Sequence, residues 1–309
     1  MKRRDFIKAS AVGAAGISLL GMPFSAEAAQ QLTLTILHTN DQHSRIDPMP
    51  ADGRKYGGMG GMARRASLIE KVRREEPNVL LLDAGDIWQG TPYFNFFKGE
   101  LEYQLMSQMK YDAATLGNHD FDNGLEGLHN QLPKAEFPFL VANYNFNNTI
   151  LKNRFQPYKV FEKQGLRIGV FGLGIELAGL VSKNNYGQTE YLDPVAVARE
   201  MVQELRGQQK CHLVICLSHL GYSYKDEKID DLKLAGQVEG IDLIIGGHTH
   251  TFLDVPTIVQ NTGGQTLVNQ VGWSGIFLGR IDFTFNKKTK QRTAFRTAVL
   301  PVDNPVLTS

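Results

Sequence analysis

Side chains that can bind metal ions recur at five separate places in this chain of 309 residues. In chain order they are Asp41 and His43, Asp86, Asn118, His219, and His248 with His250. Taken singly, each group has an ordinary explanation as a turn, a helix cap or surface residues. Together they provide two carboxylates, one amide and four imidazoles, which a hydrophobic framework does not require. We therefore predict one metal centre built from all five groups.

The types of ligand restrict the metal and the chemistry. Nitrogen and oxygen ligands without a thiolate suit divalent zinc, manganese, iron or nickel rather than copper(I). Seven side chains are too many for one tetrahedral ion, and a carboxylate can bridge two ions. Two ions about 3.5–4 Å apart can activate water and hold the oxygens of a phosphate ester during displacement. We expect two divalent metal ions (Mn, Zn or Fe) as cofactors, and phosphoester hydrolysis as the chemistry.

The segments between these groups indicate an α/β fold. Short apolar runs predict strands at 32–37, 79–82, 113–115, 139–142, 168–171, 212–218 and 243–245, and helical periodicity marks 62–75, 95–109, 125–132 and 195–206. A β-rich C-terminal segment follows, with strands at 257–260, 266–270, 276–285 and 292–299. In layered α/β folds, ligands bind just beyond the carboxyl ends of the strands, where the five groups fall. We therefore expect them to converge on one cleft.

The net charge and the number of cysteines exclude several other kinds of function and site. A net charge of +1 argues against nucleic acid as a partner. The chain has two cysteines, too few for a cysteine-built metal site or a disulfide scaffold. Cys211 and Cys216 fall in one predicted strand, which would place their Cα atoms roughly 16 Å apart, so we predict buried thiols.

The first 29 residues are typical of an export signal. Arg3 and Arg4 belong to a basic start, a mild apolar run follows, and Ala26-Glu27-Ala28 is a small-x-small cleavage site. The arginine pair favours a twin-arginine signal over 1–29 and a mature domain over 30–309. We expect a periplasmic or secreted protein with no stable membrane span after cleavage. An ordinary secretory signal and an uncleaved anchor are the alternatives.

In order and spacing, the five groups resemble the signature of the calcineurin-like metallophosphoesterases, and within them the 5′-nucleotidase / 2′,3′-cyclic phosphodiesterase family. The matching stretches include Leu37-His38-Thr39-Asn40-Asp41-Gln42-His43, Gly85-Asp86, Gly117-Asn118-His119-Asp120-Phe121-Asp122 and Gly246-Gly247-His248-Thr249-His250. The resemblance implies a four-layer α-β-β-α sandwich. It implies one ion held by Asp41, His43, Asp86 and His250, and another held by Asp86, Asn118, His219 and His248.

The same resemblance implies a catalytic pair. A metal-bridging hydroxide would attack phosphorus, while His119 would contact the phosphate and stabilise the transition state or the leaving oxygen. Asp122 would orient His119 through its other ring nitrogen. Asp120 is the alternative partner, but adjacent side chains on an extended turn point apart, so we favour Asp122. The alternative for His119 itself is a structural histidine in a tight loop.

The implied function is an exported dimetal hydrolase of nucleotides, nucleotide sugars or related phosphate esters. Typical family members continue into a second domain that stacks the nucleobase, whereas this chain stops at Ser309. A separately encoded 5′-nucleotidase C-terminal domain is therefore a candidate partner, without which the chain would be inactive on nucleotides. Another alternative is a thiosulfohydrolase with two manganese ions. Trp88, Tyr93 and Phe94 could line the cleft mouth, but aromatic residues that open a helix are more often part of the core. Asn143 and Asn145 could lie at the same rim.

Overall fold

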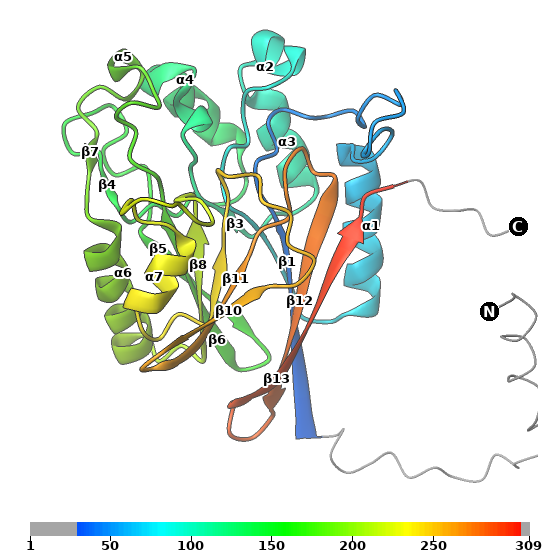
Figure 1. The fold of residues 1–309 in the computed structure, drawn as a ribbon, viewed down its shortest axis with the longest axis vertical. Helices are drawn as coiled ribbons and strands as arrows, with labels where there is room; N and C mark the ends of the chain where they lie inside the picture. The colour runs from blue at the N-terminus through cyan, green and yellow to red at the C-terminus, as the bar shows by residue number, and fades with distance from the viewer. Residues whose placement is uncertain (1–29, 304–309) are drawn as a thin grey trace, which may run out of the picture. The chain divides into compact units, whose positions relative to one another are not determined.

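Two β-sheets lie at the centre of the computed structural model, which describes residues 30–303 (Figure 1). The predicted signal, 1–29, lies outside the described residues. The five-stranded sheet has the order β13 (Arg292–Pro301), β12 (Phe277–Asn286), β1 (Gln31–Thr39), β2 (Val79–Asp83) and β3 (Ala113–Ala114). The six-stranded sheet has the order β10 (Thr257–Asn261), β11 (Gly264–Asn269), β9 (Leu243–Ile245), β8 (Leu213–Ser218), β6 (Leu166–Leu173) and β5 (Tyr158–Lys163). A short antiparallel pair joins β4 (Tyr144–Asn145) and β7 (Glu190–Tyr191).

The two sheets pack face to face through one apolar core. Alternate residues of β1 and β2, such as Leu34 and Leu80, share this core with Ile215 of β8 and Ile245 of β9. Successive side chains of a strand point to opposite faces of its sheet, so the remaining apolar residues of each strand face outward. Both faces of the central strands are therefore buried, which explains their nearly continuous apolar sequences.

Helices cover both outer faces. α1 (Met62–Glu75), α3 (Glu100–Gln108) and α4 (Gly124–Gln131) pack on the five-stranded sheet. On the six-stranded sheet lie α6 (Pro194–Val202) and α7 (Asp231–Gln237), and Figure 1 shows α1 and α6 on opposite sides of the molecule. This is the α-β-β-α sandwich with a β-rich C-terminal segment, so the predicted fold class is confirmed. None of the helices in the described part of the chain has the length and apolar character that crossing a bilayer requires.

Most predicted elements lie within a few residues of the observed ones, and two predictions are wrong. The predicted helix 95–109 is interrupted at Lys98 and Gly99, between α2 (Pro92–Phe97) and α3. Gly99 has a φ of 95°, and a Cβ atom there would lie 2.1 Å from the Trp88 ring. The predicted strand 139–142 forms only isolated bridges, from Phe139 to Ala114 and from Leu140 to Gln156.

Three smaller features complete the comparison with the sequence. The predicted helix 195–206 begins as α6 and continues as the π-helical segment Gln203–Gln208. The structure adds β5, α7 and the short α5 (Lys183–Tyr186), which sequence reasoning did not predict. Cys211 and Cys216 are buried free thiols, as predicted.

Candidate metal centre

The predicted ligands lie in loops at the carboxyl ends of parallel strands from both sheets. Asp41 and His43 follow β1, which pairs in parallel with β2, and Asp86 follows β2. In the other sheet, β8 pairs in parallel with β9, and their loops carry His219 and His248. Because the carboxyl ends of parallel strands share one edge of a sheet, each sheet presents its ligands at one edge. The remaining two are Asn118, after β3, and His250, after β9.

Five of the seven predicted ligands have a left-handed backbone, which is uncommon for residues other than glycine. Their φ angles are 50° at Asp41, 49° at His43, 55° at Asp86, 69° at His248 and 53° at His250. Such conformations cluster where the surrounding structure holds a functional site. Hydrogen bonds between the loops hold them here: the Asp41 N–H donates to Gly85 O at 2.9 Å, and the His43 N–H donates to Asp86 O at 3.0 Å.

The first ligand group consists of Asp41, His43 and His250. The Nε2 atoms of the two histidines lie 2.9 Å apart, and His250 Nε2 lies 3.3 Å from Asp41 Oδ1. The Asp41 carboxylate is fully buried and also accepts the His248 N–H at 3.0 and 3.1 Å. One carboxylate and two imidazoles thus point their ligand atoms at a common point.

The second group consists of Asp86, His219 and His248. His219 Nε2 lies 3.1 Å from Asp86 Oδ2, and His248 Nδ1 lies 2.8 Å from Asn118 Oδ1, which adds the predicted amide ligand. Asp86 Oδ2 also lies 3.9 Å from His43 Nε2, in the first group. Asp86 therefore lies where a carboxylate shared by two ions would have to be.

The protonation of the histidines fits cation binding. Burial lowers the pKa of His43, and it lowers that of His248 to about 4, which leaves neutral rings with a lone pair to offer. His219 Nδ1 forms a hydrogen bond with Ala84 O at 2.7 Å, so the proton of a neutral His219 ring lies on Nδ1. The Nε2 atom of that neutral ring would then direct its lone pair at the lone pairs of the Asp86 carboxylate, which is unfavourable. Burial alone lowers the pKa of His219, but the Asp86 and Asp41 carboxylates raise it to about 10. A positive charge between His219 Nε2 and the Asp86 carboxylate removes this repulsion, and either a proton or a bound divalent cation can provide that charge. The residues therefore fit the predicted ions.

His119 and Asp122 lie at the rim of these groups. His119 Nδ1 and Asp122 Oδ2 are 2.8 Å apart, with 36% and 27% of their side chains exposed, so a substrate can reach the pair. The His119 N–H donates to Asp86 Oδ1 at 2.8 Å, and its ring lies 5.3 Å from that of His43. The hydrogen bond with Asp122 raises the pKa of His119. The structure thus places Asp122, rather than Asp120, against the ring nitrogen of His119.

Asp120 instead holds two loops together. Its buried carboxylate accepts backbone N–H groups of Gly117 at 2.8 Å, Asp86 at 3.0 Å, Ile87 at 3.1 Å and Trp88 at 3.3 Å. Burial and the Asp86 carboxylate raise the pKa of Asp120 to about 7, and hydrogen bonds to N–H groups favour its ionised form. Asp120 therefore fixes the loop after β2 against the loop after β3.

Three of the five residues considered for the cleft mouth, Trp88, Phe94 and Asn143, are buried. Trp88 and Phe94 are buried in the core, whereas Tyr93 is partly buried, with its hydroxyl donating to Asp47 Oδ2 at 2.7 Å. The amide of Asn143 is buried and bonded to the backbone of Gly174. Asn145 bonds Glu190 in the β4–β7 pair. Trp88 and Phe94 thus follow the alternative, a place in the core, and the buried Asn143 amide is used by the backbone.

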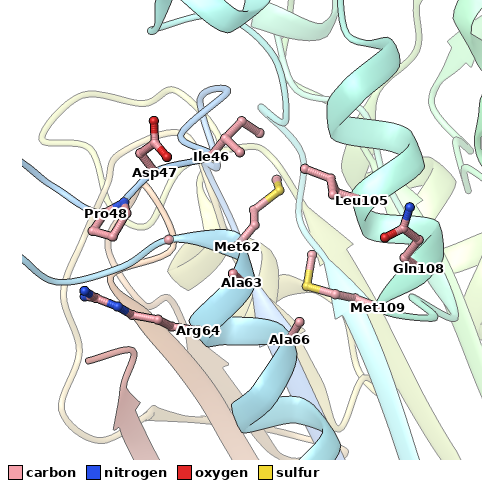
Figure 2. Close-up of a pocket in the computed structure, with 11 residues that line it drawn as sticks. Ile46, Asp47, Pro48, Met62, Ala63, Arg64, Ala66, Leu105, Gln108 and Met109 are labelled. Atoms are coloured by element: carbon pink, nitrogen blue, oxygen red, sulfur yellow. The ribbon is translucent and has the colours of Figure 1, made fainter. Parts of the chain in front are cut away.

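A cavity of about 510 Å³ lies away from the ligand groups, between α1 and α3 (Figure 2). Met62, Leu105 and Met109 give it a mainly apolar lining, and none of the predicted ligands or catalytic residues takes part. The candidate ligand groups therefore lie outside this cavity.

Sequence reasoning missed two residues beside the ligands. Asn40 Nδ2 donates to Asp41 Oδ2 and to Gly272 O, both at 2.6 Å, which joins the loop after β1 to the loop before β12. In the sequence, the only indication of this role is that Asn40 directly precedes the predicted ligand Asp41. Trp273 stacks on His250, with ring centroids 6.0 Å apart and planes 18° from parallel. No motif surrounds Trp273, so the sequence offers no signal for it.

Comparison with known proteins agrees with this geometry. The calcineurin-like phosphoesterase family profile matches residues 34–252, which contain every predicted ligand. The chain belongs to this family. A snake venom 5′-nucleotidase of Crotalus adamanteus is 38% identical over an alignment of 284 residues, and the match covers 84% of this chain and 47% of that protein. The chain spans about half the length of the curated 5′-nucleotidases it matches.

Solved structures of the family show the same fold. A 5′-nucleotidase precursor from Thermus thermophilus superposes with a TM-score of 0.79 at 35% identity, covering 87% of this chain and 54% of that one. A sulfate thiohydrolase SoxB from the same organism gives a TM-score of 0.73 at 20% identity, covering 87% and 56%. At that identity the second likeness shows the shared fold alone.

Proposed function

We propose that this calcineurin-like phosphoesterase hydrolyses phosphate esters of nucleotides at a centre of two divalent ions. One observation carries the proposal: two ligand groups meet at Asp86, with the exposed pair His119 and Asp122 beside them. The 5′-nucleotidases among the relatives, 38% and 35% identical, support nucleotides as the substrate class.

The ligand roles follow from the two groups. Asp86 would be shared, since its Oδ2 lies between His219 Nε2 at 3.1 Å and His43 Nε2 at 3.9 Å. When bound, the two ions supply Lewis-acid stabilisation of the phosphate and activate water as the nucleophile. One ion would be held by Asp41, His43, Asp86 and His250, and the other by Asp86, Asn118, His219 and His248.

His119 would act on the phosphate directly. Its Nδ1 donates to Asp122, which fixes the ring and holds a proton on that nitrogen. The hydrogen bond with Asp122 raises the pKa of His119, which favours the imidazolium form, in which Nε2 also carries a proton. That N–H can donate to a phosphate oxygen or to the leaving oxygen as negative charge develops there.

A substrate panel tests this function. The purified chain would be loaded with manganese or with zinc and given AMP, a 2′,3′-cyclic nucleotide, a UDP-sugar and nitrophenyl phosphate. We expect hydrolysis of AMP that requires metal. Hydrolysis of the nitrophenyl ester alone would place nucleotide recognition on another chain, such as a separately encoded C-terminal domain. Hydrolysis of none of these four phosphate esters by the metal-loaded chain would contradict the proposal. Cleavage of the sulfur–sulfur bond of an S-thiosulfonate would then favour the thiosulfohydrolase alternative.

We further propose that the protein is exported through the twin-arginine route to the periplasm or beyond. The support is the sequence of residues 1–29, with its Arg3-Arg4 pair and the small residues Ala26 and Ala28.

A further inference from the structure

Trp273 is held against the candidate metal centre. The chain has two tryptophans: Trp88 is fully buried, whereas Trp273 is partly exposed. Its indole stacks on the His250 imidazole at 6.0 Å between ring centroids, and His250 Nε2 lies 3.3 Å from Asp41 Oδ1. A single side chain therefore separates an accessible indole from the ligand atoms.

The backbone fixes this indole with respect to the ligands. On one side of it, Gly272 O accepts the Asn40 amide at 2.6 Å. On the other side, the Ser274 N–H donates to Asp41 O at 2.7 Å. Both neighbours of Trp273 are thus tied to the segment that carries Asp41. These hydrogen bonds fix the backbone on both sides of Trp273, so its indole ring is held in place before any ligand binds.

Beside Trp273 lies a cavity of about 170 Å³, closed on its other side by the loop 49–57. Tyr56 is a second aromatic residue in its lining and stacks on Phe252, with centroids 5.0 Å apart and planes 21° from parallel. The loop is held by hydrogen bonds between Met49 and Met59 at 2.7 Å and between Gly58 and Met49 at 2.9 Å. The volume is below the roughly 300 Å³ of pockets that enclose whole ligands, so the cavity suits one part of a ligand.

Most of the charge on the lining is compensated. Arg54 forms an ion pair with Asp52, so two of the charged side chains compensate each other. Lys55 lies over the Tyr56 ring, 4.9 Å from its centroid. The cavity therefore has two aromatic residues in its lining and one positive charge without an acidic partner in that lining, which lies over the Tyr56 ring; a planar heteroaromatic ring can stack on such aromatic side chains.

We propose that Trp273 and the loop 49–57 form a subsite for the heteroaromatic base of a nucleotide whose phosphate lies at the metal centre. The proposal rests on the proposed function. A nucleotide carries its base one sugar away from its phosphate, and the indole lies one side chain away from the ligand atoms. Bases stack on aromatic side chains with little regard to sequence, since every base has a π face.

Tryptophan fluorescence tests the subsite without catalysis. Adenosine has the base and the sugar but no phosphate ester, and Trp273 is the accessible fluorophore of the two. We expect adenosine to quench the fluorescence saturably, ribose not to quench it, and Trp273→Phe to abolish the adenosine effect. Absence of saturable quenching, or equal quenching by ribose, would overturn the proposal. This result stands even if the chain hydrolyses no nucleotide, so the two proposals can fail separately.

Kinetics provide the second test. Trp273→Leu should raise KM for AMP about tenfold and leave KM for ribose 5-phosphate unchanged, because only AMP has a base to stack. Phe96→Leu is the matched control, since Phe96 is an aromatic residue of α2 that is 80% exposed and does not line the cavity. It should change neither value. Equal losses on both substrates in Trp273→Leu would mean that Trp273 only supports His250, and would refute the subsite.

Discussion

At the scale of single residues, the hydrogen bond between His119 and Asp122 sets the protonation of the histidine. It raises the pKa of His119, whose imidazolium form the proposed role requires. Asp122→Asn keeps an oxygen in place but removes its charge, so the pKa of His119 falls. We predict that the alkaline limb of kcat against pH moves to lower pH, and that kcat above neutral pH falls about 10–100-fold.

His119→Ala is the reference for this experiment. It should remove the limb that Asp122→Asn displaces, while the metal content stays unchanged, because His119 belongs to neither ligand group. An unchanged pH profile in Asp122→Asn would show that the carboxylate does not act through His119. Loss of metal in His119→Ala would instead make His119 a ligand.

At the scale of elements, Asp120 joins the loops after β2 and β3. Each of its two oxygens accepts two backbone N–H groups, among them that of the strained residue Asp86. In Asp120→Asn one oxygen becomes an NH₂ group, so two N–H donors lose their acceptor. We predict that affinity for metal, measured by titration of the stripped protein with manganese, falls about 10–100-fold.

Asp112→Asn is the matched control for Asp120→Asn. Asp112 also accepts a backbone N–H, that of Leu81 at 2.8 Å, but it lies outside the ligand loops. It should lower the thermal stability without changing the affinity for manganese. If the two variants lower stability equally and neither changes metal affinity, Asp120 has only a structural role.

The elements also show what the sequence can predict. The ligand loops were predictable because apolar strands end in polar residues, a pattern local to each segment. The break before α3 was not, because it depends on the close approach of Gly99 to the Trp88 ring. β5 was missed since it is a half-buried edge strand with charged residues. The β10–β11 hairpin separates Trp273 from His250 in the sequence, and the fold of this hairpin brings the two rings together. A pattern within either segment therefore cannot reveal the contact.

At the scale of the whole molecule, the candidate centre is divided between the two sheets. Loops of the five-stranded sheet carry Asp41, His43, Asp86 and Asn118, and loops of the six-stranded sheet carry His219, His248 and His250. Each ligand group draws on both sheets, since His250 joins Asp41 and His219 joins Asp86. A complete ligand set therefore exists only after the two sheets have packed together, so binding of the ions follows folding.

This division leads to a prediction about export. A twin-arginine signal carries proteins that are already folded, so the ions would be loaded in the cytoplasm. The double variant Arg3→Lys, Arg4→Lys should accumulate inside the cell. We expect the same metals, in the same ratio to protein, in this retained form and in the exported wild type, as measured by elemental analysis after rapid purification. Different metals in the two pools would mean that the ions bind after export. Continued export of the double variant would show that the twin-arginine route is not used.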